Sequence, residues 1–313
     1  MNLFLTNVCN ESCSFCYAES YFKAAPKADP RQLQALYRHL DAYAALVATA
    51  PPLPPWSDNQ DELARSFYAA RTVNLLGGEP TLHPHFVDVV NAVHERGLGV
   101  IVFTNGSMPK RIAEVRDKLW SITMNGLFAH RAPGLGFPLE RVYANLPIRP
   151  GEDIVAALTP IRDAGIKGVF LAFATPAGGA QSGAFTPNDL DAMKQVHGAA
   201  LDFCRKHGIF LGYDCSFPLC VDERVQQTRC SSVPVMDPAG NLTICGGDYF
   251  YEPGKRHISS FTSLEDLHGY TFGLLEGLRT LPSRFDVCNR CEHFNKDCHG
   301  MCLVYRERSD LAH

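Results

Sequence analysis

Three cysteines near the start of the chain, Cys9, Cys13 and Cys16, are spaced C-x3-C-x2-C directly after a short apolar run. Thiolates packed this closely can each bind one iron of a four-iron cubane cluster, which leaves the fourth iron without a protein ligand. A metal with an open coordination position can bind and transform a substrate. The spacing therefore predicts a catalytic iron–sulfur site. A zinc site is the alternative, but it needs a fourth ligand, and the nearest histidine, His39, is distant in the sequence.

A second group of cysteines lies in the last third of the chain, where nine of the twelve cysteines fall between residues 204 and 302. Cys230 and Cys245 enclose Gly240 in the pattern C-x9-G-x4-C. A later block, C-x2-C-x6-C-x3-C, consists of Cys288, Cys291, Cys298 and Cys302. Clustered cysteines in a large chain without an export signal bind metal more often than they form disulfides. Zinc is again the alternative to iron. Cys204 has apolar neighbours in a helix-like stretch, which predicts a buried structural thiol.

Polar residues stand next to three of the strand-like runs. Gly77-Gly78-Glu79-Pro80 follows the second run, where two glycines let the backbone approach a ligand closely and Glu79 offers a carboxylate. Thr104 and Asn105 end the third run, and Ser121 begins the fourth. Ligands of barrel proteins gather at the carboxyl ends of the strands, so these residues are candidates for cofactor binding. A simple turn is the alternative at Thr104 and Asn105.

Two carboxylates near the later cysteines are candidate general bases. Asp248 lies three residues after Cys245, and Asp214 directly precedes Cys215. A carboxylate beside a cluster in a water-poor site can have the raised pKa that proton abstraction needs. Capping of a turn is the alternative for both residues.

Strand-like apolar runs alternate with helix-like stretches, which predicts βαβ units and a parallel sheet. The strands are expected at 3–6, 73–76, 100–104, 121–124, 142–148, 169–172 and 209–213, and the helices at 30–48, 85–96, 109–118, 152–164, 187–207 and 263–278. Residues 1–207 accommodate six strand–helix units, which are too few for a closed eight-stranded barrel. We therefore predict an α/β fold in which residues 1–208 form a partial (β/α)6 TIM-like barrel. A small cysteine-rich domain at 209–313, held together by metal, would follow it.

The overall composition argues against several classes of partner. The net charge is -4 and no run rich in lysine and arginine is present, so nucleic acid and anionic membranes are not expected partners. No apolar stretch approaches the roughly 18 residues of a membrane span. The start of the chain lacks the features of a signal peptide. These observations predict a cytoplasmic protein.

The first cysteine motif, flanked by Phe15 and Tyr17, resembles the defining motif of radical S-adenosylmethionine (SAM) enzymes, and Leu76–Leu82 resembles their GGEPT motif. The resemblance implies that the open iron chelates the amino and carboxylate groups of SAM and that the glycine motif contacts its amino group. Tyr17 and the strand residues Thr104, Asn105 and Ser121 would line the same site. It also implies an oxygen-sensitive enzyme that cleaves SAM reductively to a 5′-deoxyadenosyl radical.

The later cysteines resemble the SPASM extension of these enzymes, which carries auxiliary [4Fe–4S] clusters. By that resemblance the first auxiliary cluster would use Cys230, Cys245, Cys302 and either Cys215 or Cys220. The second would use Cys288, Cys291 and Cys298. The block has x6 where the family usually has x5, and no cysteine follows Cys302 to supply the family's last ligand. Cys215, an oxygen or nitrogen ligand such as Asp310, or an open iron are alternatives there, so one or two auxiliary clusters are expected.

Enzymes of this type mostly act on peptides or proteins, and auxiliary clusters can accept an electron from a substrate radical. The resemblance therefore implies oxidation or crosslinking of a ribosomally made peptide. A separate leader-binding protein or a short substrate is expected, because no leader-binding domain precedes Cys9. An external electron donor such as flavodoxin or ferredoxin is also expected. The alternatives are a dehydrogenase or mutase acting on a small metabolite, and a non-catalytic, zinc-stabilised binding protein.

Overall fold

The computed structural model describes residues 1–16, 30–52, 69–174, 183–214, 217–225, 233–244 and 255–306. Its described strands form one sheet in the order β10-β9-β8-β1-β2-β3-β4-β5-β6-β7, and neighbours from β1 to β7 are all parallel. The parallel strands are β1 (Asn2–Thr6), β2 (Thr72–Gly77), β3 (Gly99–Thr104), β4 (Leu119–Asn125), β5 (Val142–Ile148), β6 (Gly168–Phe173) and β7 (Phe210–Tyr213).

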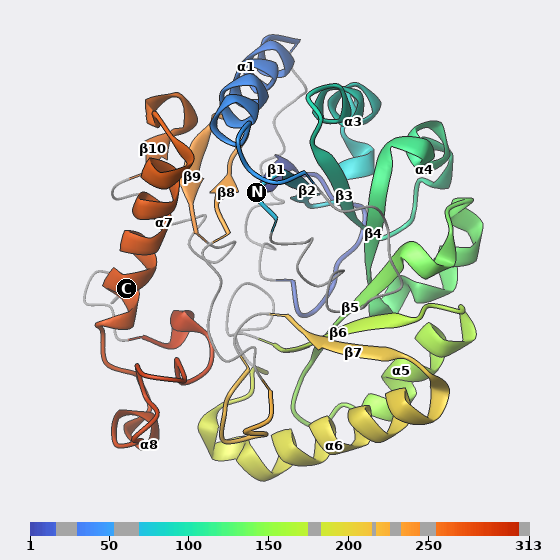
Figure 1. The fold of residues 1–313 in the computed structure, drawn as a ribbon. Coiled ribbons are helices and arrows are strands. Elements are labelled where there is room, and N and C mark those ends of the chain that lie inside the picture. Colours follow the sequence, from blue (N-terminus) through green and yellow to red (C-terminus); the bar gives the residue numbers. More distant parts are fainter. Residues whose placement is uncertain are drawn as a thin grey trace.

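Helices connect most of these strands and lie along the outside of the curved sheet (Figure 1). They are α1 (Pro30–Leu46), α3 (Phe86–Glu95), α4 (Pro109–Val115), α5 (Ile154–Asp163) and α6 (Leu190–His207). Local signals set their ends. Asp153 accepts hydrogen bonds from the first free N–H groups of α5, and Gly208 ends α6 in the left-handed conformation with φ 61°. Between β4 and β5 the chain instead forms a 3-10 segment, Gly126–Leu135.

The two faces of the sheet bury different side chains. The outer face belongs to one large core that includes Val100, Val102 and Ile122 together with apolar residues of the helices. The inner face carries a smaller cluster, which consists of Ile101 and Tyr143 packed against Phe103, Trp120 and Phe170. Glycine makes room for these rings, because a Cβ on Gly168 would lie 2.4 Å from the Tyr143 ring and one on Gly212 would lie 2.8 Å from the Phe170 ring. The inner face is therefore a filled wall of the partial barrel.

The last third of the chain extends this sheet at the edge formed by β1. Strand β8 (Val235–Met236) pairs parallel with β1, and β9 (Asn241–Thr243) and β10 (Arg256–His257) continue in antiparallel fashion. At the other edge β7 pairs with β6. Parts of the predicted cysteine-rich region therefore belong to the same sheet as the barrel strands.

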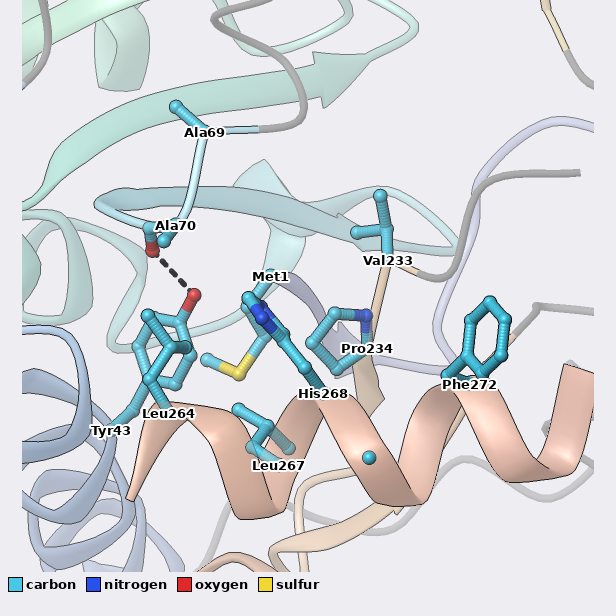
Figure 2. A pocket seen from close by; sticks show the side chains of 11 residues that line it. Met1, Tyr43, Ala69, Ala70, Val233, Pro234, Leu264, Leu267, His268 and Phe272 are labelled. Carbon is cyan, nitrogen blue, oxygen red and sulfur yellow. Dashed lines mark hydrogen bonds between the residues drawn. The ribbon is translucent and has the colours of Figure 1, made fainter. Parts of the chain in front are cut away.

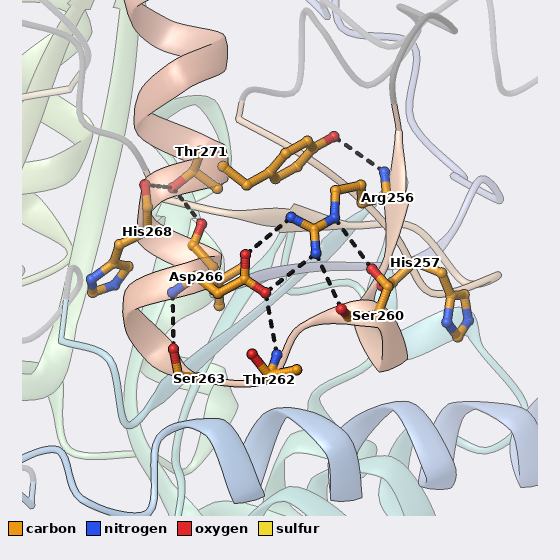
Figure 3. Close-up of polar contacts among 10 residues, drawn as sticks. Arg256, His257, Ser260, Thr262, Ser263, Asp266, His268 and Thr271 are labelled. Atoms are coloured by element: carbon orange, nitrogen blue, oxygen red, sulfur yellow. Dashed lines mark hydrogen bonds and ion pairs between the residues drawn. The ribbon is translucent and has the colours of Figure 1, made fainter.

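Helix α7 (Leu264–Arg279) is fastened to β10 by a polar network (Figure 3). The Arg256 guanidinium donates to both carboxylate oxygens of Asp266, at 3.1 and 3.3 Å, and to the carbonyl of Ser260. It also lies 4.0 Å above the ring of Phe261. Ser263 caps the helix by accepting from the N–H of Asp266 at 3.0 Å. A short helix, α8 (Asp286–Asn289), then leads into the last cysteine block.

The predicted α/β class and the partial barrel are confirmed, and the predicted helices and strands agree with the observed ones within a few residues. The three short strands β8, β9 and β10 were not predicted. Each has two or three residues, too few for apolar alternation to be recognisable in the sequence. None of the helices in the described ranges is long and apolar enough to span a membrane.

Candidate functional site

The first cysteine motif lies on the loop that leaves the carboxyl end of β1. Cys9, Cys13 and Cys16 are partly exposed, and the N–H of Cys16 donates to the carbonyl of Cys13 at 3.0 Å in a tight turn. Burial raises the pKa of Cys13 to about 11, and the neighbouring thiols of Cys16 and Cys9 add to the rise. Three thiols this close need nearby positive charge to ionise together, and bound iron supplies such charge.

The two glycines after β2 hold this cysteine loop in place. A Cβ on Gly77, whose φ is 144°, would lie 2.2 Å from the carbonyl oxygen of Thr6, and one on Gly78 would lie 2.2 Å from that of Val8. The same approach allows the N–H of Gly78 to donate to Thr6 at 2.8 Å and that of Glu79 to donate to Val8 at 2.7 Å. The close approach excludes a side chain at both positions.

Glu79 is completely buried beneath the cysteine loop and joins the ends of β2 and β3. Its Oε1 accepts from the N–H and hydroxyl of Thr81 at 3.0 and 2.5 Å and from the hydroxyl of Thr104 at 2.8 Å. Its Oε2 accepts from the N–H of Asn105 at 2.6 Å. All four donors are neutral, and no lysine, arginine or histidine of the described chain forms an ion pair with this carboxylate. The carboxylate lies behind Gly77 and Gly78, which are partly exposed.

A second layer of polar contacts orients the spacer between Cys9 and Cys13. The side-chain amide of Asn105 donates to Asn10 at 2.9 Å. Arg131, from the 3-10 segment after β4, donates to the Glu11 carboxylate at 2.8 Å and to the carbonyl of Asn105 at 3.0 Å. Sequence reasoning missed Asn10, Glu11 and Arg131. The first two stand inside the C-x3-C spacer and could have been suspected, whereas Arg131 is 120 residues from its partner and gave no local signal.

Ser121 lies away from this group, near the amino end of β4. It pairs in register with Ile101, whereas Thr104 pairs with Met124, three residues farther along the strand. Three residues of a strand span about 10 Å, so Ser121 lies that far below the carboxyl end. Its hydroxyl is buried and has no hydrogen-bond partner among the described residues.

Asp214 lies at the carboxyl end of β7, the same end of the sheet as the cysteine loop. Its carboxylate accepts from the side-chain amide of Asn145 at 2.6 Å, and its N–H donates to Leu171. Asn145 is in register with Phe170, which belongs to the inner-face cluster. Asp214 and Asn145 therefore form a polar pair toward the barrel interior.

Four described cysteines of the last third, Cys220, Cys288, Cys291 and Cys298, affect one another's ionisation. Burial raises the pKa of Cys288 to about 11, and the nearby thiols of Cys220, Cys298 and Cys291 contribute. Cys298 is buried and Cys302 is partly exposed. Cys204 is buried, as predicted. The other predicted site residues, Tyr17, Cys215, Cys230, Cys245 and Asp248, lie outside the described residues.

No three cysteine, histidine, aspartate or glutamate side chains in the described ranges converge closely enough to hold a single metal ion. A tetrahedral zinc with Zn–S bonds of about 2.3 Å needs sulfurs about 3.8 Å apart. The thiolates of a cubane bind different iron atoms and stand farther apart.

A large cavity lies at the opposite end of the sheet and is not part of this site (Figure 2). Its volume is about 530 Å³. Met1, Ala70 and Pro234, which border it, precede β1, β2 and β8, and α7 closes one side with Leu267 and Phe272. The cysteine loop leaves the carboxyl end of the same sheet.

Comparison with known proteins agrees with this fold. The crystal structure of Streptococcus suis SuiB bound to S-adenosylmethionine superposes with a TM-score of 0.64 at 14% identity, covering 98% of this chain and 76% of that chain. Native anSMEcpe with bound S-adenosylmethionine gives 0.63 at 12% identity, covering 96% of this chain and 88% of that chain. An S-adenosylmethionine-dependent nucleotide dehydratase of Selenomonas ruminantium is 29% identical over 108 residues, which are 34% of this chain and 30% of that protein.

The match to that curated relative thus spans less than a third of its length. The sequence pattern of the radical SAM superfamily itself matches residues 3–177, more than half of the chain. This range contains the three cysteines, the glycine motif and the first six strands of the barrel. The chain therefore belongs to the radical SAM superfamily.

Proposed function

We propose that this enzyme oxidises or crosslinks a peptide by a radical reaction that starts at the cysteine loop of β1. The observation that carries the proposal is the presence of two cysteine groups in one chain. One group stands at the carboxyl end of a radical SAM barrel and the other lies in the region after β7. A second redox centre suits an oxidative outcome, because a substrate radical that loses an electron needs an acceptor nearby.

Cys9, Cys13 and Cys16 would hold the first cluster, and the backbone of Gly77 and Gly78 would face the amino group of SAM. When bound, the cluster and SAM supply a 5′-deoxyadenosyl radical that abstracts hydrogen from an unactivated C–H bond. The chain itself fixes the cysteine loop through the bonds to Thr6 and Val8 and keeps Glu79 buried behind it. These contacts preorganise the loop before any ligand binds.

Asp214 is the proposed proton acceptor of the oxidative step. The hydrogen atom taken from the substrate would go to 5′-deoxyadenosine, one electron would go to an auxiliary cluster, and one proton would go to a carboxylate. Asp214 lies at the correct end of the sheet, and the 2.6 Å hydrogen bond from Asn145 fixes its orientation. Asp248 is the alternative base that the sequence offers.

The choice of a peptide is supported by proteins of the same fold. SuiB has been solved with its precursor peptide SuiA, and anSMEcpe with a Cp18Cys peptide. Each of these two structures superposes on 96% of the chain described here. A separate leader-binding protein and a flavodoxin- or ferredoxin-type electron donor would complete the system.

The proposal can be tested with anaerobically reconstituted protein, dithionite and SAM. Formation of 5′-deoxyadenosine in the native protein, and its loss in the C9A/C13A/C16A variant, would establish the radical start. Short peptides encoded beside the gene would then be added and examined by mass spectrometry. Loss of two hydrogen atoms from one peptide, accompanied by increased SAM cleavage, is the expected result. SAM cleavage that no such peptide stimulates or that leaves every peptide unaltered contradicts the proposal.

A second candidate is a reaction on a small molecule. The partial match to a nucleotide dehydratase favours this candidate. The described inner wall near the carboxyl ends of the strands also favours it, because Thr123 and Asn145 are uncharged there and Asp214 supplies one carboxylate. A panel of ribonucleoside triphosphates in the same assay distinguishes the two candidates. Water loss from one nucleotide would favour the second.

A further inference from the structure

The spacer between the first two cysteines carries a carboxylate at its middle position. Glu11 stands two residues from Cys9 and two residues from Cys13. Because consecutive Cα atoms are 3.8 Å apart, the Cα of Glu11 lies within about 8 Å of the Cα of each cysteine. Only 25% of its side chain is exposed, which limits the screening of its charge by water and salt. A negative charge this close to the first cluster makes the arrival of an electron less favourable.

Arg131 supplies the opposite charge from a part of the chain that is 120 residues away. Its Nη1 donates to Oε1 of Glu11 at 2.8 Å and to the carbonyl of Asn105 at 3.0 Å. The central carbon of its guanidinium also lies 4.5 Å from the centre of the Phe128 ring. A carboxylate, a carbonyl and a ring therefore fix the guanidinium beside the spacer. A guanidinium keeps its positive charge throughout the pH range in which proteins are folded.

The turn after β3 makes room for this arginine and also holds the spacer independently of it. Gly106 has φ 72°, and a Cβ there would lie 2.7 Å from the end of Met124 and 3.3 Å from the Cβ of Arg131. Asn105, the preceding residue, donates from its side-chain amide to Asn10 at 2.9 Å. This bond involves neither member of the ion pair. We therefore expect the spacer to stay bound to Asn105 when either charge of the pair is removed.

We propose that Arg131 is a positioning residue whose charge neutralises that of Glu11 and so facilitates reduction of the first cluster. The inference rests on the radical start of the proposed function, and not on the identity of the substrate. Reduction adds one electron to the cluster from an external reductant and makes the cluster more negative by one unit. Glu11 opposes this change and Arg131 favours it, so the two together add almost no net charge. The two side chains must then act on the midpoint potential of the cluster in opposite directions.

The test measures this potential in Arg131→Met, in Glu11→Gln and in the double variant. Each protein is reconstituted anaerobically and reduced stepwise with dithionite, without SAM or peptide, and the reduced clusters are followed by EPR spectroscopy. The signal of the first cluster is the one that the C9A/C13A/C16A protein lacks. Methionine keeps the apolar stem of the arginine, and glutamine keeps the shape of the glutamate, so each single change removes mainly a charge.

Arg131→Met is expected to shift the midpoint potential to more negative values, and Glu11→Gln is expected to shift it to more positive values. The double variant is expected to return to the native potential, because both charges are then absent. Arg162→Met is the matched control. Arg162 also pairs with a carboxylate, that of Asp163 at 2.7 Å, and lies 5.8 Å from the ring of Phe203. It stands at the end of α5 that leads into the amino end of β6, away from the cysteine loop, and should leave the potential unchanged.

A merely structural role of the ion pair predicts a different pattern. A displaced cysteine loop would change the potential in the same direction in both single variants, and the double variant would not restore it. That pattern, or an unchanged potential in Arg131→Met with full iron content, overturns the proposal. Where Arg131→Met binds too little iron for the titration, Glu11→Gln decides, and a potential that does not rise overturns the proposal. A native protein without the EPR signal overturns the proposed function as well, whereas a shift of the wrong sign overturns the role of Arg131 alone.

Discussion

Replacement of Glu79 by glutamine separates a structural role of this carboxylate from direct binding of SAM. In the structure the carboxylate accepts four hydrogen bonds and has no exposed surface. A glutamine that keeps its oxygen toward Thr81 and Thr104 must point its NH2 group at the N–H of Asn105, where two donors then face each other. The change loses one charge-assisted hydrogen bond, worth about 1.5–3 kcal/mol, and leaves a buried N–H without an acceptor at a cost of about 1–3 kcal/mol.

Removal of a buried charge regains part of this loss, because Glu79 has no cationic partner among the described residues. We therefore expect Glu79→Gln to reduce the free energy of unfolding by about 2–4 kcal/mol. The measurement is urea unfolding of the anaerobically reconstituted protein, followed by circular dichroism. Glu114→Gln is the matched control because Glu114 is exposed on α4. The reasoning is refuted if the Glu79 variant unfolds like the control while its Kd for SAM rises, since that pattern indicates a contact with the ligand alone.

Three further predictions concern the glycine motif and two histidines. Gly78→Ala should displace the cysteine loop and remove about four irons on reconstitution, whereas Gly134→Ala, which has open space around its Cβ, should leave the iron content unchanged. Burial lowers the pKa of His83 to about 4, so the unfolded chain binds more protons below pH 6.5. Stability should therefore fall by on the order of 1 kcal/mol between pH 7.5 and 5, and His83→Gln should flatten this dependence in urea titrations. Tyr213→Phe removes the partner of His197 at 2.6 Å and should cost about 1–3 kcal/mol of unfolding free energy, measured by the same titrations.

The sequence predicted the parts of the site that depend on local spacing. The C-x3-C-x2-C motif, the glycine motif and the strand that ends at Thr104 were recognisable because their residues are neighbours in the chain. The burial of Glu79 was not predicted, because its donors come from two different strand ends. Arg131 was missed for the same reason, since its partner Glu11 is 120 residues away. Contacts between distant segments depend on which strands become neighbours in the sheet, and the spacing of residues within one segment does not show which strands these are.

The last third of the chain has contacts that do not depend on metal in addition to its cysteines. From its composition we expected that metal would hold residues 209–313 together. In the structure β8 also pairs parallel with β1, and Arg256 and Asp266 join β10 to α7. These contacts contain no thiol, and we therefore expect them to persist when iron is absent. Cluster loading should therefore order the cysteine segments onto a scaffold that is already folded. Far-UV circular dichroism of the iron-free protein is expected to retain the signal of α7 and the extended sheet, and a loss of that helical signal on chelation would contradict this view.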